Sequence, residues 1–345
     1  MKRHCIFPFE RIQIELDGDV TFCCTAFNKN YSIGNIFTDE IDDIWYGKKA
    51  KEFRKSILDG SYKYCNLNIC GNYYDEYFGK LNYNEDTLSP PYPNFVYLSY
   101  MPSCNVKCKI CRDNIRLETK EETEHFNSIA DKIILLCKNA EIIYLNGGGE
   151  LFTSPHCKQI IKRLKDTYPK IRFFIHTNGL LCDEAHIKEY GLDGKVDIFN
   201  ISIHAATKKT YESIVRGGHW EQLQKNLKYL SSQKCKLFLP FVINSLNYKE
   251  MPAFVKMAHK LNATPLFWML RDKGYSHSHS QMCKELDKYT CWKASHPDYN
   301  DFLKVLNKLK RMKKYKYSLI EESLRVLQSQ TTDPWWVRFT KFFNF

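Results

Sequence analysis

Three cysteines, Cys104, Cys108 and Cys111, lie within eight positions in the order C-x3-C-x2-C. Thiolates this close in sequence can share one metal centre, but a closed zinc site and an ordinary [4Fe–4S] cluster each take four protein ligands. No fourth cysteine is nearby in the sequence. The spacing therefore predicts an iron–sulfur cluster with one iron left open for another ligand. The alternatives are a zinc knuckle and three unrelated thiols.

The triplet directly follows a β-rich run, and five more such runs come after it, alternating with helical patterns. Strands that alternate with helices predict a parallel sheet. Six βα units are too few for a closed eight-stranded barrel, so we expect an α/β fold with a partial (β/α)6 TIM-like barrel. The predicted strands are 95–100, 141–145, 171–177, 197–203, 236–243 and 265–270, and the predicted helices lie around 120–138, 155–167, 183–190, 207–232 and 248–261.

Glycines and polar residues follow the other predicted strands, at the ends where parallel α/β folds place their chemistry. Gly147, Gly148, Gly149 and Glu150 follow the second strand, Thr177 and Asn178 end the third, Ser202 and His204 end the fourth, and Asn244 ends the fifth. Because the carboxyl ends of parallel strands meet at one edge of a sheet, these residues and the triplet predict a single site.

The triplet, with NGGGE (146–150) and ISIHAATKKTYESIVRGG (201–218), resembles the radical S-adenosylmethionine (SAM) superfamily over roughly residues 95–270. In that family the three cysteines hold a [4Fe–4S] cluster, and the amino and carboxylate groups of SAM chelate its open iron. The resemblance implies that the glycine-rich stretch meets the SAM amino group, which suits glycine because its backbone can approach a ligand closely. It implies further cofactor contacts at Ile110, Asn178, Ser202 and Arg216, with Arg216 pairing with the carboxylate.

Two positions depart from the family pattern. Ile110 stands before the third cysteine, where the family usually has an aromatic residue near the adenine, although an aliphatic side chain can also cover that face. His204 stands where related segments often have aspartate. A histidine there is a candidate catalytic residue, acting through a hydrogen bond or a substrate contact. The alternative is a structural histidine whose hydrogen bonds are satisfied within the fold.

A hairpin and a helix precede the barrel. RIQIEL-DG-DVTFCC (11–24) predicts a β-hairpin that turns at Asp17-Gly18. A helix is expected over roughly 39–59, capped by Asp39 and ended by Gly60. These elements bury little by themselves, so the cysteines around them predict a metal centre that staples the small domain.

Those cysteines, with the hairpin glycine and the helix, follow the order of the auxiliary-cluster modules called SPASM or twitch domains, which they resemble. The resemblance implies a second [4Fe–4S] cluster, and a structural zinc site is the alternative. Cys24 competes with Cys23, and because neighbours on a strand point to opposite faces, only one of them should face the metal. The expected ligands are Cys5, Cys23, Cys65 and Cys70, with Cys283 and Cys291 as further candidates.

Proline-rich LSPPYPN (88–94) is interpreted as a linker, because proline removes backbone donors and favours extended backbone. The expected organisation is an auxiliary-cluster α+β domain at 1–87, the linker, a barrel at 95–275, and a helical extension with an aromatic tail at 276–345. We expect the tail PWWVRFTKFFNF (334–345) to pack on its own barrel. Peripheral contact with a partner or a membrane surface is the alternative.

Composition limits the classes of function. The chain has 345 residues, of which 43% are hydrophobic and 26% charged, the balance of a globular protein. The net charge of +12 comes from diffuse Lys and Arg, so no nucleic-acid partner is expected. The sequence shows neither a bilayer-spanning apolar run nor a secretory signal, which predicts a cytoplasmic protein.

The family resemblance implies reductive cleavage of SAM to a 5′-deoxyadenosyl radical, which abstracts hydrogen from a substrate carbon. It also implies an external one-electron donor of the flavodoxin or ferredoxin type, and electron transfer by the auxiliary cluster. We expect a small-molecule substrate such as a sugar or nucleotide derivative, because the sequence leaves no room for a separate peptide-binding domain. The alternatives are modification of a peptide or protein, and a non-enzymatic iron–sulfur or zinc protein.

Overall fold

The computed structural model describes residues 4–24, 27–67, 70, 78–79, 85–145, 148–270, 280–312 and 318–319. Gly147 and the aromatic tail at 334–345 lie outside the described residues. The chain forms two compact units. The first comprises Met1–Cys104, Leu117–His176 and Lys188–Val196, and the second comprises Asn105–Arg116, Thr177–Ile187 and Asp197–Phe345.

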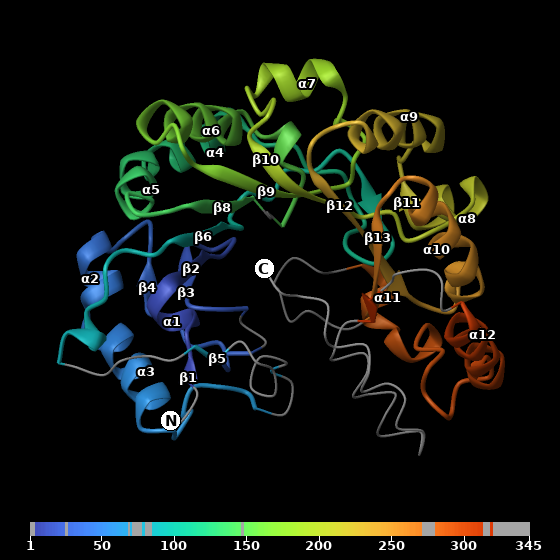
Figure 1. Cartoon of the computed structure of the whole chain (residues 1–345), viewed down its shortest axis with the longest axis horizontal. Coiled ribbons are helices and arrows are strands. Elements are labelled where there is room, and N and C mark those ends of the chain that lie inside the picture. Colours follow the sequence, from blue (N-terminus) through green and yellow to red (C-terminus); the bar gives the residue numbers. More distant parts are fainter. Residues whose placement is uncertain are drawn as a thin grey trace. The chain divides into compact units, whose positions relative to one another are not determined.

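In the first unit, the N-terminal hairpin and the first barrel strands are hydrogen-bonded neighbours in one sheet (Figure 1). The hairpin and the next strand form antiparallel pairs, whereas the barrel strands join in parallel. The first hairpin strand also pairs in parallel with the first barrel strand. The sequence predicted the hairpin and the barrel strands but not the pairing that joins them. In sheet order the strands are β4 (Gly34–Asn35), β3 (Asp19–Thr21), β2 (Arg11–Ile14), β6 (Phe95–Leu98), β8 (Ile142–Leu145) and β9 (Arg172–Thr177).

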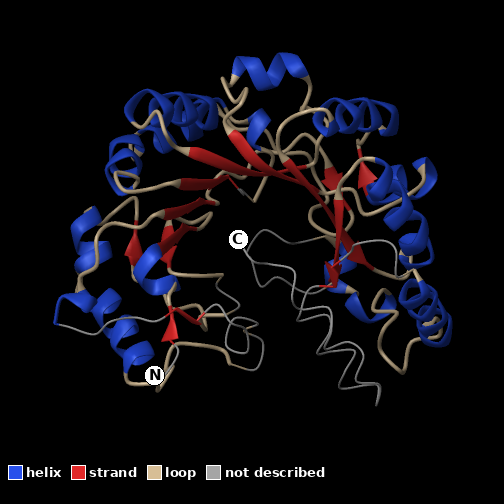
Figure 2. Cartoon of the chain, viewed as in Figure 1, coloured by secondary structure: helices blue, strands red, loops and turns tan. Residues whose placement is uncertain are grey.

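Alternating burial explains how these strands form a core. Val96 and Leu98 of β6, and Ile143 and Leu145 of β8, are fully buried, whereas the residues between them are partly exposed. Three helices lie along one side of these strands in Figures 1 and 2. They are α4 (Lys120–Asn127), α5 (Ala130–Leu136) and α6 (Pro155–Thr167). A capping box at the start of α4 and a serine N-cap at the start of α6 fix where two of them begin.

The second unit also contains parallel strands. β10 (Val196–Ile201) pairs with β12 (Lys236–Ile243), β12 with β13 (Thr264–Met269), and β13 with β14 (Ser318–Leu319). A short antiparallel ladder joins β7 (Lys107–Cys108) to β11 (Val215–Arg216). The remaining helices of the chain's second half are α7 (Glu184–Glu189), α8 (Lys208–Ile214), α9 (Trp220–Ser231), α10 (Met251–Lys260), α11 (Gln281–Lys284) and α12 (Tyr299–Arg311).

The strands confirm the predicted α/β class, with all six barrel strands found where the sequence placed them. The helix expected over 39–59 is instead two helices, α2 (Ile41–Tyr46) and α3 (Lys48–Leu58). They separate at Gly47, whose backbone is extended and where a Cβ would lie 1.9 Å from the Asp43 carbonyl oxygen. The patterns at 120–138 and 207–232 are likewise each divided into two helices, α4 and α5, and α8 and α9.

Asp39 does not cap the helix as predicted. Its carboxylate accepts hydrogen bonds from the Asn35 amide (2.8 Å) and the Thr38 hydroxyl (2.9 Å), so it closes the preceding turn. Glu40 takes the N-cap position of α2 without a capping bond from its side chain. The expected end is right, because Gly60 follows α3 with a φ of 78°, a conformation that favours glycine.

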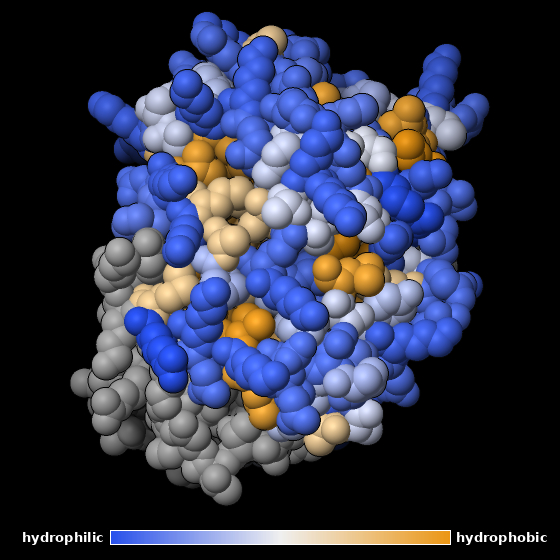
Figure 3. Space-filling model, turned by 90° about the vertical axis from the view of Figure 1, so that its right-hand side faces the viewer, coloured by the Kyte–Doolittle hydropathy of each residue, from blue (hydrophilic) through white to orange (hydrophobic). Residues whose placement is uncertain are grey.

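The face drawn in Figure 3 is largely hydrophilic, with hydrophobic side chains in small, separate areas. Within the described residues, none of the helices has the length and apolar character needed to cross a bilayer.

A buried arginine ties the N-terminal elements together. Arg54 of α3 is fully buried, and its guanidinium donates to the carbonyls of Pro8 (2.9 Å), Trp45 (2.7 Å) and Leu88 (3.1 Å). These carbonyls belong to α1 (Phe7–Glu10), to α2 and to a 3-10 helix (Glu85–Leu88). One side chain therefore satisfies backbone acceptors of three separate elements, and burial lowers its pKa to about 9.

We predict that Arg54→Lys and Arg54→Ala each lower the free energy of unfolding by about 3 kcal/mol, because an ammonium group cannot reach three carbonyls and alanine reaches none. Chemical denaturation measures the change. Lys51→Ala, at an exposed position of the same helix, is the control and should change stability by less than about 0.5 kcal/mol. Wild-type stability in Arg54→Lys would contradict the role given to the guanidinium.

Candidate metal and cofactor sites

Four cysteines of the N-terminal region come together. Cys5 belongs to β1 (His4–Cys5), Cys23 follows β3, and Cys65 and Cys70 follow α3. Burial raises the pKa of the Cys23 thiol well above its ordinary value, and the thiols of Cys5, Cys65 and Cys70 raise it further. Burial also raises the pKa of Cys5 and of Cys65 to about 12. The four thiols therefore lie within electrostatic reach of one another, and bound iron would favour their thiolate forms.

Cys24 has a different environment from Cys23. The pKa of Tyr97, on β6, is raised by burial and also by the thiol of Cys24. The Cys23 carbonyl accepts hydrogen bonds from the side chains of Thr21 (2.9 Å) and Asn28 (3.4 Å). The Cys23 thiol interacts with those of Cys5, Cys65 and Cys70, and also with that of Cys24, so the choice of Cys23 over Cys24 stays a prediction.

In the described parts of the chain, no three His, Cys, Asp or Glu side chains are arranged around a single metal ion. A [4Fe–4S] cluster makes a different demand, because each thiolate binds its own iron. The donor set of four thiols near the hairpin suits that demand.

The start of the C-x3-C-x2-C loop is fixed within the first unit. The Ser103 hydroxyl contacts the carbonyl (3.1 Å) and hydroxyl (2.9 Å) oxygens of Thr153 and accepts a hydrogen bond from the Glu118 amide (3.2 Å). The Ser103 carbonyl accepts from the Glu150 amide at 2.5 Å. Cys104 itself is only 8% exposed. The first cysteine of the triplet therefore follows a tightly held serine.

The glycine-rich stretch lies against this serine. A Cβ on Gly149 would lie 1.9 Å from the Ser103 carbonyl oxygen, and one on Gly148 would lie 2.3 Å from a Leu16 methyl group. Glu150 is almost fully buried and accepts a hydrogen bond from the Phe152 amide (3.4 Å). Gly149 is thus required for close backbone approach, and the backbone it approaches leads directly into Cys104, whereas Gly148 makes room for the Leu16 side chain.

The rest of the loop is held within the second unit. Cys108 lies in the β7–β11 ladder, and the Lys109 amide donates to the Ile214 carbonyl at 2.8 Å. The Cys111 amide donates back to the Cys108 carbonyl at 2.9 Å. Ile110 is buried between them, and its carbonyl accepts from the Cys283 thiol (3.5 Å). Cys283 is therefore placed at this loop.

Cys291, the other cysteine named as a further ligand, is fully buried. Burial raises the pKa of its thiol above the ordinary range, and the carboxylate of Asp298 raises it further. These surroundings are those of a buried structural thiol.

Arg216 contacts the loop that carries Cys108 and Cys111. Its Nε donates to the Lys107 carbonyl (3.1 Å), and its Nη2 donates to the Arg112 carbonyl (3.4 Å) and the Asp113 carboxylate (2.9 Å). Three of its five donors are directed at this loop.

Asn178, Ser202 and His204 all lie in the second unit, at or beyond the ends of strands. The Asn178 side-chain Nδ2 donates to the Asn105 side-chain oxygen at 2.8 Å, so it contacts the residue after Cys104. The Ser202 amide donates to the Thr177 carbonyl at 2.9 Å.

His204 has a left-handed backbone with a φ of 62°, and its side chain is buried. Its Nδ1 accepts from the Val242 amide (3.0 Å), and its carbonyl accepts from the Asn247 side chain (2.8 Å). The proton is therefore on Nε2, so the neutral ring can present a donor but no second acceptor.

The sequence did not reveal a buried polar network behind the start of the loop. The Tyr100 hydroxyl donates to His156 Nε2 (2.5 Å), and His156 Nδ1 donates to the Asn127 side-chain oxygen (2.7 Å). Burial lowers the pKa of His156 to about 4, so it is neutral at physiological pH. The Glu118 carboxylate accepts from the Ser154 hydroxyl and the His156 amide. Spacing offers no signal for this network, because its members come from separate elements.

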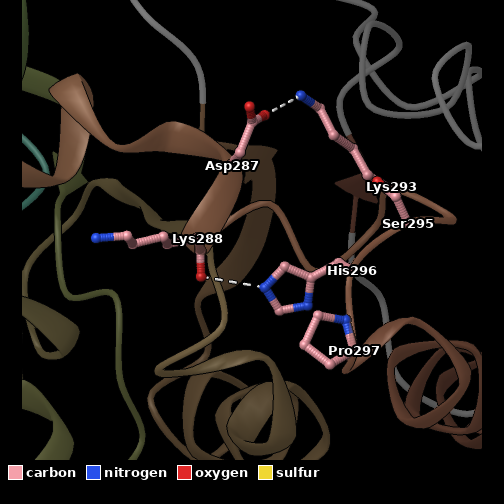
Figure 4. A pocket seen from close by; sticks show the side chains of 6 residues that line it. All are labelled: Asp287, Lys288, Lys293, Ser295, His296 and Pro297. Atoms are coloured by element: carbon pink, nitrogen blue, oxygen red, sulfur yellow. Dashed lines mark hydrogen bonds and ion pairs between the residues drawn. The ribbon is translucent and has the colours of Figure 1, made fainter.

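A surface hollow lined by residues between Asp287 and Pro297 has polar groups that pair with one another, which does not favour a binding site there (Figure 4). Lys293 pairs with Asp287 at 2.5 Å across it, and His296 Nε2 donates to the Lys288 carbonyl at 3.1 Å. The other ring nitrogen of His296 accepts from the Asp298 amide at 3.0 Å. Both ring nitrogens of His296 are therefore occupied by hydrogen bonds to nearby backbone groups.

We predict that Gly149→Ala destabilises the protein by about 2 kcal/mol or more, because the added methyl group would collide with backbone at Ser103. Gly148→Ala meets a side chain instead, so Leu16→Ala should recover much of its loss in the double variant. Thermal and denaturant unfolding of the four variants measures both effects. Equal losses at both glycines without recovery would contradict this account.

Glu15, at the end of β2, should make stability fall as pH rises. Its side chain is 7% exposed and accepts from the Gln13 side-chain Nε2 (2.8 Å). Burial, with the charges of Asp17 and Asp19 nearby, raises its pKa to about 7. The folded chain thus holds this proton more tightly than the unfolded chain, whose value is 4.5. Stability is lost between about pH 4.5 and 7, by up to about 3 kcal/mol.

Glu15→Gln should therefore raise the free energy of unfolding relative to wild type at pH 8, with little difference at pH 4. Urea unfolding across this pH range measures it. Glu124→Gln, at an exposed position of α4, is the control and should leave the profile unchanged. A Glu15→Gln profile parallel to that of wild type would show that the carboxyl does not titrate in this window.

Comparison with known proteins agrees with this geometry. The SPASM iron–sulfur cluster-binding domain matches residues 5–71, and the radical SAM superfamily matches residues 98–258. Among curated proteins, a probable GTP 3′,8-cyclase of Methanococcus maripaludis is 28% identical over 174 residues, 48% of this chain and 55% of that protein. The FeMo cofactor biosynthesis protein NifB of Methanocaldococcus jannaschii is 23% identical over 144 residues, 39% of this chain and 46% of that protein.

Among solved structures, Streptococcus suis SuiB bound to its precursor peptide SuiA aligns with a TM-score of 0.45 and 13% identity, over 92% of this chain and 73% of SuiB. The chain spans about half the length of the curated relatives it matches. The two family matches cover the two cysteine sets separately and confirm the expected cofactors, SAM and [4Fe–4S] clusters. The chain belongs to the radical SAM superfamily of enzymes and carries a SPASM iron–sulfur module in its N-terminal part.

Proposed function

We propose that this protein cleaves SAM reductively and uses the resulting radical to abstract hydrogen from a carbon of a small-molecule substrate. Cys104, Cys108 and Cys111 would hold the catalytic [4Fe–4S] cluster. Bound there, the cluster and SAM supply a 5′-deoxyadenosyl radical and methionine, with one electron entering from a flavodoxin- or ferredoxin-type donor. The protein's own residues bind, orient and shield these groups.

The observation that carries the proposal is the contact between the glycine-rich stretch and the start of the cysteine loop. The Glu150 amide donates to the Ser103 carbonyl at 2.5 Å, and Gly149 leaves no room for a side chain there. A cluster held in part by Cys104 would therefore lie near the backbone of Gly148 and Gly149, where a cofactor bound to its open iron could also meet that backbone. Gly148, Gly149 and Glu150 are accordingly assigned to the amino group of SAM.

Further cofactor contacts are proposed for four residues at or near strand ends or the cysteine loop. Asn178, which bonds to the residue after Cys104, and Ser202, at the end of β10, are assigned to the ribose and carboxylate of SAM. Ile110 would cover a face of the adenine. His204 can donate from Nε2, which suits a hydrogen bond to cofactor or substrate oxygen but not a general base in its neutral form.

The N-terminal cysteines would hold an auxiliary [4Fe–4S] cluster. Cys5, Cys23, Cys65 and Cys70 supply one thiolate for each iron, so this cluster keeps no open position and suits electron transfer. The domain that contains these cysteines is joined to β6 by the pairing of β2 with β6. The Cys24 thiol also raises the pKa of Tyr97 on β6. The auxiliary centre is therefore attached to the strand that leads into the catalytic loop.

A sugar or nucleotide derivative is the favoured substrate class. The curated relatives are named probable GTP 3′,8-cyclases, and GTP is a nucleotide. Each is similar to this chain over 174 residues. Modification of a peptide is the second candidate, because SuiB is described with a precursor peptide. Deuterium transfer from labelled candidates into 5′-deoxyadenosine separates the two classes.

The first test is anaerobic reconstitution followed by reduction with dithionite in the presence of SAM. Wild type should bind about eight irons per chain and form 5′-deoxyadenosine. The Cys104/Cys108/Cys111→Ala variant should retain about four irons and form none, whereas Cys5/Cys23/Cys65/Cys70→Ala should retain about four irons on the triplet.

Cys235→Ala, at a half-buried cysteine outside both sets, is the matched control and should behave as wild type. Wild-type protein that loads iron but forms no 5′-deoxyadenosine would overturn the proposed reaction.

A further inference from the structure

The loop that carries Cys108 and Cys111 is held by one side chain from another part of the second unit. Arg216 is the last residue of β11, which pairs with β7 across the middle of this loop. Its guanidinium bonds to Lys107, before Cys108, and to Arg112 and Asp113, after Cys111. Both cysteines are therefore bracketed by contacts to a single planar group.

The contacts are directional. Nε reaches the Lys107 carbonyl at 3.1 Å, and Nη2 reaches the Arg112 carbonyl at 3.4 Å and the Asp113 carboxylate at 2.9 Å. Because the guanidinium is flat and rigid, these bonds fix the distance between the two ends of the loop. A lysine at this position would keep the charge but lose the fixed fork.

The loop also forms a turn of its own, and its middle contacts the same neighbouring segment as Arg216. The Cys111 and Arg112 amides both donate to the Cys108 carbonyl at 2.9 Å, which forms one tight turn. The Lys109 amide donates to Ile214, and the Lys109 side chain reaches the Ser213 hydroxyl at 3.3 Å. Both of these Lys109 contacts end on the segment from Ser213 to Arg216, and the Cys283 thiol donates to the Ile110 carbonyl at 3.5 Å.

A cluster on three cysteines needs such a support more than one on four. Four protein ligands close a metal centre and hold each other in place, whereas three leave part of the geometry to surrounding hydrogen bonds. The positive guanidinium also lies next to a loop that would carry two thiolates, and it offsets part of their mutual repulsion.

We propose that Arg216 is a positioning residue that holds Cys108 and Cys111 in the geometry of the cluster, and not a ligand of the SAM carboxylate. The inference rests on the proposed function only in that the triplet holds a cluster. Asp113 completes the clamp, because its carboxylate accepts a second hydrogen bond from Nη2.

The test measures cluster retention and SAM binding separately in reconstituted full-length protein. Iron release to bipyridyl after dithionite reduction reports retention, and the SAM-induced change in the electron paramagnetic resonance spectrum reports binding at the open iron. The variants are Arg216→Gln, Arg216→Lys and Asp113→Asn. Arg163→Gln is the matched control, because Arg163 also pairs with an aspartate (Asp131, 2.5 Å) but lies on α6.

Arg216→Gln should release about four of its irons roughly tenfold faster than wild type, because glutamine cannot replace the charge-assisted hydrogen bonds of the guanidinium. Arg216→Lys should also release them faster, and Asp113→Asn by a smaller factor because its amide oxygen can still accept. The SAM concentration for half-maximal spectral change should stay within about twofold for the loaded fraction. The slower irons, on the N-terminal cysteines, show that each variant is folded.

Iron release from Arg216→Gln at the rate of wild type and Arg163→Gln would overturn the inference. If SAM binding alone then weakened, Arg216 would be assigned to the carboxylate. Neither of these results for the Arg216 variants contradicts the proposed function. That function fails separately if wild type shows no spectral response to SAM and forms no 5′-deoxyadenosine.

Discussion

The parallel pairing of β2 with β6 is the contact on which the first unit depends. It continues beyond the strands, because the Ser99 amide donates to the Ile14 carbonyl at 2.9 Å, and Leu16 fills the space left by the missing side chain of Gly148. One sheet therefore carries the hairpin next to the auxiliary cysteines, the strand that leads to Cys104, and the glycine-rich turn. A shift of β2 by one residue would turn its buried isoleucines outward. It would also displace the hairpin, the strand that leads to Cys104 and the glycine-rich turn relative to one another.

Around the cysteine triplet, residues other than cysteine do most of the positioning. Ser103 is held through both its hydroxyl and its carbonyl, and Arg216 brackets the later part of the loop. Behind Ser103, Glu118 and the neutral His156 join α4, α6 and the end of β6 in a buried hydrogen-bond network. Such a network is costly when any member is missing, so it favours one arrangement of the backbone that enters the loop.

The sequence was sufficient wherever a local pattern decides the structure. The alternation of β-rich runs and helical patterns located β12 to the residue, and the Asp17-Gly18 turn located the hairpin. It was insufficient where a contact joins distant segments. Asp39 was expected to cap a helix because aspartate often does, but the Asn35 amide lies within its reach and takes the carboxylate. The contacts of Arg216 with the Lys107 and Arg112 carbonyls likewise join distant segments, and nothing in the spacing of these residues predicts them. The break at Gly47 and the burial of Arg54 also arise from packing between elements.

The position of β2 between β3 and β6 has a consequence for the order in which the chain is made. The ribosome completes the hairpin, α2 and α3 long before it reaches Phe95, the first residue of β6. Until then, one edge of β2 has no strand beside it, and Ile12 and Ile14, both fully buried in the finished protein, lack the side chains of β6. An unpaired apolar edge is prone to pair with other chains. During synthesis, the N-terminal module is therefore incomplete until β6, the strand that precedes Cys104, has been made and pairs with β2.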